Sequence, residues 1–133
     1  MKNTKQVGEL SEAMILARFL ELGFVVLQPF GDNQRYDLVV EKPAGFVRVQ
    51  CKTAKLNADG SVLSFSCKSN AGGYNRRDYK GEIDAFAVYS HEIKKCFFIP
   101  IDDAGVSQMF LRLINPKNNT SITTVNWAKD YEL

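Results

Sequence analysis

The chain has 133 residues, which is enough for one domain with a real hydrophobic core and no stabilising disulfides. Its hydrophobic fraction of 45% and charged fraction of 24% are those of an ordinary globular protein. Its net charge of +2 is too small to indicate by itself what kind of partner the protein binds. Because no apolar run can cross a bilayer and three widely spaced cysteines lack zinc-ligand spacing, we expect a cytoplasmic protein with reduced thiols and no membrane association.

The N-terminal segment predicts a helix followed by a strand. Residues 4–22 have apolar side chains at helical spacing, with Asn3 or Thr4 as the N-cap and Gly23 as the stop signal. The side chains expected to face the core are Val7, Leu10, Met14, Ala17 and Leu20. A short apolar strand is predicted at residues 24–28.

A hairpin is predicted in the middle of the chain. Residues 36–40 and 47–52 alternate like strands, and residues 43–46 form the turn between them. One face of this hairpin is apolar and suited to a core. It consists of Leu38, Val40, Val47, Val49 and Cys51.

The other face of the hairpin collects polar groups. The expected register places Asp37 opposite Lys52, and Val39 opposite Gln50. A carboxylate and an amide oxygen can hold a divalent cation, and an ammonium group beside them can orient an activated water. The pattern also fits a plain cross-strand ion pair of Asp37 with Lys52, worth about 0–1 kcal/mol.

Beyond the hairpin, the pattern predicts three more strands and a helix. Residues 62–67 alternate, while residues 83–89 and 96–101 are apolar at nearly every position, as in strands buried on both faces. Residues 106–114 are expected to form a helix capped near Asp103. This order of elements predicts a single α/β domain with a mixed sheet.

Basic residues concentrate between residues 46 and 80. Such a concentration would suit a groove that binds a polyanion. The alternative is an ordinary mixture of charged side chains on a solvated surface. A loop rich in Gly, Asn and Arg spans residues 68–80. Two tyrosines of this loop, Tyr74 and Tyr79, could pack on sugars or bases. The candidates for nucleic-acid contact are Gln34, Arg35, Lys55, Lys68, Tyr74, Arg76, Arg77 and Lys80.

Three segments together resemble the PD-(D/E)xK nuclease superfamily. They are the helix segment at residues 8–12, the Tyr-Asp strand start at 36–40 and the Arg-Val-Gln-Cys-Lys-Thr strand at 48–53. The resemblance is to the branch that includes a cyanobacterial group I intron homing endonuclease and its small bacterial relatives. It implies a restriction-endonuclease-like mixed β-sheet flanked by helices, in one domain over residues 1–133.

The resemblance also implies roles for individual residues. Asp37 corresponds to the metal-binding aspartate and Lys52 to the catalytic lysine. Gln50 occupies the second acidic position, a departure that the branch shares, and Glu12 matches an additional metal-site glutamate. Glu9, three residues earlier on the same side of the helix, is the alternative to Glu12. The implied metal ligands are Asp37, Glu12, Gln50 and the backbone carbonyl of Cys51.

The implied activity is Mg²⁺-dependent hydrolysis of double-stranded or branched DNA, with Mn²⁺ able to replace Mg²⁺. Two other functions stay open. One is a Holliday-junction resolvase-like nuclease. The other is a non-catalytic DNA-binding module, which is an alternative because Gln50 replaces an acidic residue. Since one chain offers one active site, cutting both strands predicts a homo-oligomer, a dimer or tetramer. The apolar side chains that could form either an interface or core are Phe97, Met109, Phe110 and Leu113.

Overall fold

The computed structural model describes residues 3–68, 79–114 and 125–133, which form one α-helix and seven strands. These are α1 (Thr4–Glu21), β1 (Val25–Leu27), β2 (Leu38–Lys42), β3 (Gly45–Leu56), β4 (Val62–Ser66), β5 (Ala85–Ser90), β6 (Lys95–Pro100) and β7 (Gln108–Arg112). Two short 3-10 helices, η2 (Ile101–Asp103) and η4 (Ala128–Asp130), complete the described elements. Within these ranges, no helix is long and apolar enough to cross a membrane.

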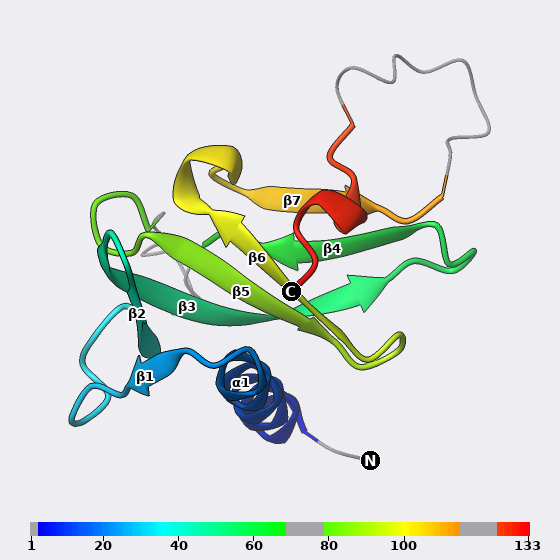
Figure 1. The fold of residues 1–133 in the computed structure, drawn as a ribbon. Coiled ribbons are helices and arrows are strands. Elements are labelled where there is room, and N and C mark those ends of the chain that lie inside the picture. The colour runs from blue at the N-terminus through cyan, green and yellow to red at the C-terminus, as the bar shows by residue number, and fades with distance from the viewer. Residues whose placement is uncertain (1–2, 69–78, 115–124) are drawn as a thin grey trace.

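Strand β3 connects all parts of the sheet. It pairs antiparallel with β2 through residues 45–49, parallel with β5 through residues 49–54, and antiparallel with β4 through residues 55–56. β1 pairs with β2, β6 with β5, and β7 with β4. In Figure 1, α1 lies on one side of the β3–β5–β6 layer, and β4 and β7 lie on the other. The mixed α/β sheet is therefore confirmed, with one described helix on one face and strands on the other.

Helix α1 begins and ends where the sequence indicated. Asn3 and Gln6 form a reciprocal capping box, in which Asn3 Oδ1 accepts from the Gln6 amide at 2.9 Å and Gln6 Oε1 from the Asn3 amide at 3.2 Å. Gly23 follows the helix with a φ of +86°, a left-handed conformation that favours glycine. The predicted limits of the helix are correct to within one residue.

The predicted buried face of α1 is wrong. The buried residues are Ser11, Ile15 and Phe19, whereas Met14 and Leu20 are exposed. Apolar side chains occur around most of this helix, so their spacing alone does not select the face. The rotation of the helix places the polar Ser11 against the sheet, where its hydroxyl finds partners in Thr53 and His91.

The β2–β3 hairpin is real, but its predicted register is wrong by two residues. Leu38 pairs with Val49, and Lys42 pairs with Gly45, so the turn holds two residues rather than four. A shift of two returns each side chain to the same face, so Leu38 and Val49 are still buried toward α1. Asp37 lies just before the ladder, and its amide donates to the Val49 carbonyl at 2.8 Å, so it does not come opposite Lys52 as predicted.

The predicted helix at residues 106–114 is wrong, because this segment contains strand β7. Met109 and Leu111 are buried, while Phe110 between them is 54% exposed, which is the alternation of a strand with one buried face. β7 pairs with β4 over all five residues of each strand. Since Phe97 and Met109 belong to the core, they are not available for a subunit interface.

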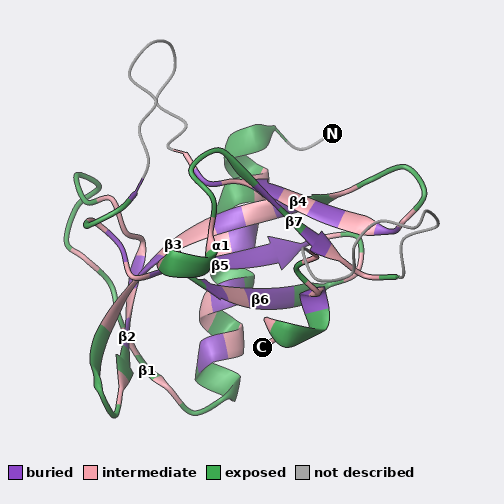
Figure 2. Ribbon diagram, turned by 90° about the horizontal axis from the view of Figure 1, so that it is seen from above, coloured by how far each residue is buried: buried purple, intermediate pink, exposed green. Residues whose placement is uncertain are grey.

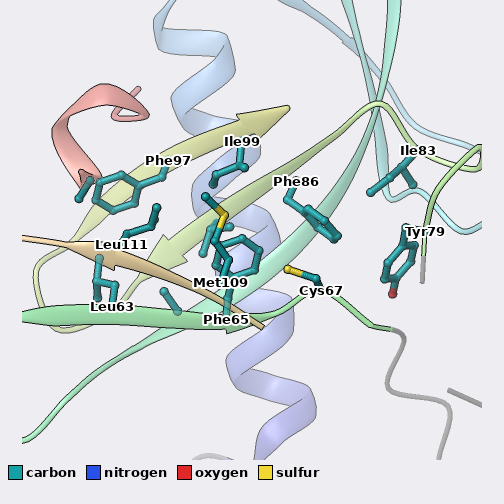
Figure 3. Close-up of a cluster of buried hydrophobic side chains, with 13 residues drawn as sticks. Leu63, Phe65, Cys67, Tyr79, Ile83, Phe86, Phe97, Ile99, Met109 and Leu111 are labelled. Atoms are coloured by element: carbon teal, nitrogen blue, oxygen red, sulfur yellow. The ribbon is translucent and has the colours of Figure 1, made fainter. Parts of the chain in front are cut away.

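The core has two halves separated by the β3–β5–β6 layer. On the α1 side, Ile15 and Phe19 pack with Leu38 and other sheet residues. On the side of β4 and β7, the larger cluster is shown in Figure 3. Its largest fully buried members are Leu63, Phe86, Phe97, Ile83, Ile99 and Leu111. β5 is buried along its whole length, as predicted and as Figure 2 shows, because it is covered by both halves.

Candidate active site

The candidate site lies at a fork in the sheet. On one edge, β3 pairs with β2 up to Val49 and with β4 from Lys55, so residues 50–54 have no strand partner there in the described part of the chain. The Asp37 amide donates to the Val49 carbonyl at 2.8 Å, and Asp37 Oδ2 accepts from the Cys51 amide at 2.9 Å. Because the N–H and C=O of one strand residue point to the same side, the Cys51 carbonyl is also directed into the fork.

Two candidate metal ligands, Glu12 and Asp37, line one cavity of about 320 Å³ beside this fork. We call it the acidic pocket. Its other lining residues are Gln28, Pro29, Gly31, Asp32, Gln34 and Tyr36, so three carboxylates and no basic side chain line it. The helix and the hairpin therefore bring together acids that are 25 residues apart in the chain.

The pKa values of both carboxyl groups are raised, in each case mainly by burial. Burial raises the pKa of Asp37, although the Cys51 amide and the Lys52 charge oppose the rise. Burial also raises the pKa of Glu12, and the nearby charges of Asp37 and Glu9 raise it further. A bound cation would relieve this repulsion. Since Glu12 lines the pocket and Glu9 is exposed, the geometry favours Glu12 as the ligand.

Lys52 is the second unusual charge of the site. It is only 8% exposed, and its Nζ donates to the Lys68 carbonyl at 2.8 Å and to the Tyr79 hydroxyl at 3.4 Å. Burial lowers the pKa of Lys52 to about 8, with the charge of Asp37 acting in the opposite direction. Among the ion pairs of the described residues there is none between Asp37 and Lys52, which removes the surface ion pair as an explanation.

Tyr79 lies between two cations and is not a surface residue. It is 4% exposed, with the Arg35 guanidinium carbon 4.0 Å and Lys52 Nζ 5.0 Å from its ring centroid. Burial raises the pKa of the Tyr79 hydroxyl. Figure 3 shows Tyr79 at the edge of the core cluster with its hydroxyl oxygen directed away from Ile83 and Phe86. The prediction that Tyr79 stacks on sugars or bases is therefore wrong, and its ring instead covers Lys52.

A second cavity, of about 490 Å³, lies on the other side of the fork. Its lining includes Gln50, Cys51, Lys52, Lys55, Gly8, Ser64, Ser66 and Gln108, with two lysines and no carboxylate in the full lining. We call it the basic groove. The sequence did not single out Gly8, Ser64, Ser66 or Gln108 as site residues. The alternation of Ser64 and Ser66 with buried Leu63 and Phe65 was the available signal, since it places the serines on the outer face.

The other predicted nucleic-acid contacts are scattered. Gln34 is exposed beside the acidic pocket, and Arg35 forms an ion pair with Glu82 at 3.8 Å. Lys68 is half-buried and Lys80 is exposed. The remaining candidates, Tyr74, Arg76 and Arg77, lie outside the described residues.

The metal ligands that the sequence resemblance implied are all oxygen atoms. Two carboxylates from Glu12 and Asp37, the Gln50 amide oxygen and the Cys51 carbonyl are the donors near the fork. Within the described ranges, no group of three or more His, Cys, Asp and Glu side chains is placed to hold a metal. A donor set of hard oxygens with few charges suits a cation that keeps part of its water shell, as Mg²⁺ does, and is unsuited to zinc.

The fold has the restriction-endonuclease-like architecture, with acids and a lysine at the open edge of a mixed sheet. The sequence profile of the PD-(D/E)XK endonucleases matches residues 2–133, and the chain belongs to this family.

Two relatives illustrate the match. Protein 5.3 of Escherichia phage T7 is 31% identical over 93 residues, which cover 69% of this chain and 77% of the phage protein. The structure of the bacterial homing endonuclease I-Ssp6803I superposes with a TM-score of 0.72 at 22% identity, covering 99% of this chain and 88% of the homing enzyme. The second comparison shows that the two chains share a fold.

Proposed function

We propose that the chain is an Mg²⁺-dependent DNA endonuclease that hydrolyses phosphodiester bonds in the manner of a homing endonuclease, with Mn²⁺ able to replace Mg²⁺. The observation that carries this proposal is the meeting of two repelling carboxylates with a buried lysine at the fork of β3. Membership of the endonuclease family supports hydrolysis of nucleic acid as the chemistry.

In this proposal Glu12, Asp37, Gln50 and the Cys51 carbonyl hold the metal ion. When bound, the ion supplies Lewis-acid activation of water and of the scissile phosphodiester. Asp37 also keeps its hydrogen bond with the Cys51 amide at 2.9 Å, which fixes the carboxylate against the strand. Gln50 contributes an oxygen without charge, so the second carboxylate from Glu12 compensates for the acid that is absent at position 50.

Lys52 orients the water nucleophile and balances negative charge as the phosphorus is attacked. Its ammonium group is held by the Lys68 carbonyl and the Tyr79 hydroxyl, so its position is fixed before substrate arrives. A preorganised donor in a partly dry site stabilises developing charge more strongly than a solvated one.

The proposal is tested with supercoiled plasmid and a synthetic four-way junction, each in Mg²⁺, Mn²⁺ and EDTA. We expect cleavage of plasmid in either metal and none in EDTA, and Lys52→Ala should abolish cleavage while folding and most DNA binding persist. Cleavage of the junction alone would favour the resolvase-like function. DNA binding without turnover in either metal would contradict catalysis and favour the non-catalytic module. Undiminished cutting by Lys52→Ala would remove Lys52 from the mechanism.

A further inference from the structure

The two cavities of the site have opposite charge and meet at one residue pair. The acidic pocket contains Asp37, the basic groove contains Cys51, and the hydrogen bond of 2.9 Å between them lies at the border. If the cation lies at this border, held by Glu12 and Asp37 from the acidic pocket and by Gln50 and Cys51 from the edge of the groove, the rest of the basic groove is left for the anionic partner. The groove is continuous with the reaction centre, since Gln50 and Lys52 line it as well.

The walls of the basic groove come from three parts of the fold. Gly8 and other residues of the first turns of α1 form one wall, and the open edge of β3 forms the floor. The outer face of β4 and β7 forms the other wall. There Ser64 pairs with Lys55, and Ser66 pairs with Gln108, which aligns their side chains on one face of the sheet.

The chemistry of these walls suits a phosphate backbone. Hydroxyl and amide side chains such as Ser64, Ser66 and Gln108 donate to phosphate oxygens, and Lys55 adds a positive charge. A volume of about 490 Å³ is in the range of sites that enclose a nucleotide-sized ligand. At Gly8 an added Cβ would meet nothing within 4 Å, so the backbone at this point is bare toward the groove.

We propose that the basic groove seats the sugar–phosphate backbone of the DNA strand next to the scissile phosphodiester, with Ser64, Ser66, Gln108 and Lys55 as its contacts. This inference rests on the proposed nuclease function and adds the path of the substrate strand. The neutral donors position the strand without reading its sequence, because sugar and phosphate are the same at every nucleotide.

The first experiment places a negative charge in the groove. Gly8→Glu puts a carboxylate where the strand would lie, and the open space at this position means that the fold tolerates the side chain. Ala17→Glu is the matched control, since it is exposed on the same helix about half a turn away around the axis. Affinity for a fluorescein-labelled duplex is measured by anisotropy in EDTA. We expect Gly8→Glu to weaken binding about tenfold and Ala17→Glu to leave it unchanged.

The second experiment separates neutral from charged contacts through the salt dependence of the same binding. Lys55→Gln should make the slope of log K against log salt shallower by about 1. The double variant Ser64→Ala/Ser66→Ala should weaken binding at every salt concentration and leave the slope as in the wild-type chain. Melting curves of all variants verify that each is folded.

The outcomes distinguish this inference from the proposed function. If the wild-type chain cleaves and binds DNA but Gly8→Glu binds as tightly as Ala17→Glu, the strand does not occupy the groove and only this inference falls. If the wild-type chain neither binds nor cleaves DNA, the proposed function falls as well. Tighter binding of a labelled protein or RNA than of the duplex would also overturn the choice of a DNA strand as the occupant.

Discussion

Lys52 combines a charge with deep burial, and this combination has a cost in stability. Burial lowers the pKa of Lys52 from 10.5 to about 8, so the folded protein disfavours the charged form. Below pH 8 the ammonium is charged in both the folded and unfolded chain, and folding bears the full cost. As the pH rises from about 8 to 10.5, the folded chain loses this proton first and the cost disappears.

We therefore expect Lys52→Met, which keeps the aliphatic stem, to raise the free energy of unfolding at pH 7. The gain should be on the order of 1–3 kcal/mol, which corresponds to the size of the shift in the Lys52 pKa. Substitutions that remove an unfavourable active-site residue commonly stabilise proteins by a similar amount. The difference from the wild-type chain should shrink above pH 8. Urea denaturation at several pH values measures it, with exposed Lys55→Met as the control. Equal stability of Lys52→Met and the wild-type chain at pH 7 would mean that Lys52 is solvated.

At the scale of elements, a polar bridge fixes helix α1 on the sheet. Ser11 Oγ lies 2.6 Å from Thr53 Oγ1 and 2.8 Å from His91 Nε2, so the helix is tied to β3 and to the turn after β5. Ser11 precedes Glu12, and Thr53 follows Lys52. The bridge thus fixes the rotation of α1 that brings Glu12 to the acidic pocket.

Removing this bridge should destabilise the protein. Ser11→Ala removes a buried hydroxyl and leaves its half-buried partners without this hydrogen bond, and we expect a loss of about 1–3 kcal/mol in the free energy of unfolding. Ser107→Ala, at an exposed serine, is the control and should change little. Chemical denaturation of both variants makes the comparison. A loss for Ser11→Ala no larger than for Ser107→Ala would show that the bridge contributes nothing.

The elements that the sequence predicted correctly are those with an unambiguous pattern. β5 and β6 are continuous apolar runs, and α1 has clear caps at Asn3 and Gly23. β7 was mistaken for a helix because a segment of only five residues with mixed spacing does not define a period. Its strand conformation comes from pairing with β4, which no local pattern records.

The site was partly predictable for a physical reason. Alternation along β3 places Gln50 and Lys52 on one face of the strand, and an error of two residues in register leaves this alternation unchanged. Asp37 lies outside the β2–β3 ladder and reaches the fork through its hydrogen bond with the Cys51 amide. The contacts of Lys52 with Lys68 and Tyr79 depend on how distant segments pack, and so did not follow from spacing. The groove walls on β4 and β7 were missed for the same reason.

At the scale of the molecule, a net charge of +2 conceals a strong local separation of charge. Acids surround one side of the fork and lysines the other, at the border where chemistry on a phosphodiester is proposed. For a chain of 133 residues with one such site, we expect a second copy to be needed to cut both strands of a duplex.

We expect a symmetric dimer or tetramer in solution, measured by size-exclusion chromatography with light scattering. Paired sites should convert supercoiled plasmid to linear product with little nicked intermediate. Among the four side chains predicted to form the interface, Phe110 is the exposed one, at 54%. Its substitution therefore tests whether this surface takes part in subunit association. A stable monomer that accumulates nicked circles would refute the expectation of paired sites.

The most direct test of the central claim, that Glu12, Asp37, Gln50 and Lys52 form one metal-dependent site, is the Mg²⁺ dependence of plasmid cleavage by the wild-type chain and Asp37→Asn side by side. The asparagine retains a hydrogen-bond acceptor for the Cys51 amide, so the fold is preserved while one metal-binding charge is lost. We predict cleavage that saturates with Mg²⁺ for the wild-type chain and at least about a hundredfold less for Asp37→Asn, a loss of the size expected when a metal ligand is removed. An unchanged Mg²⁺ dependence in Asp37→Asn would contradict the claim.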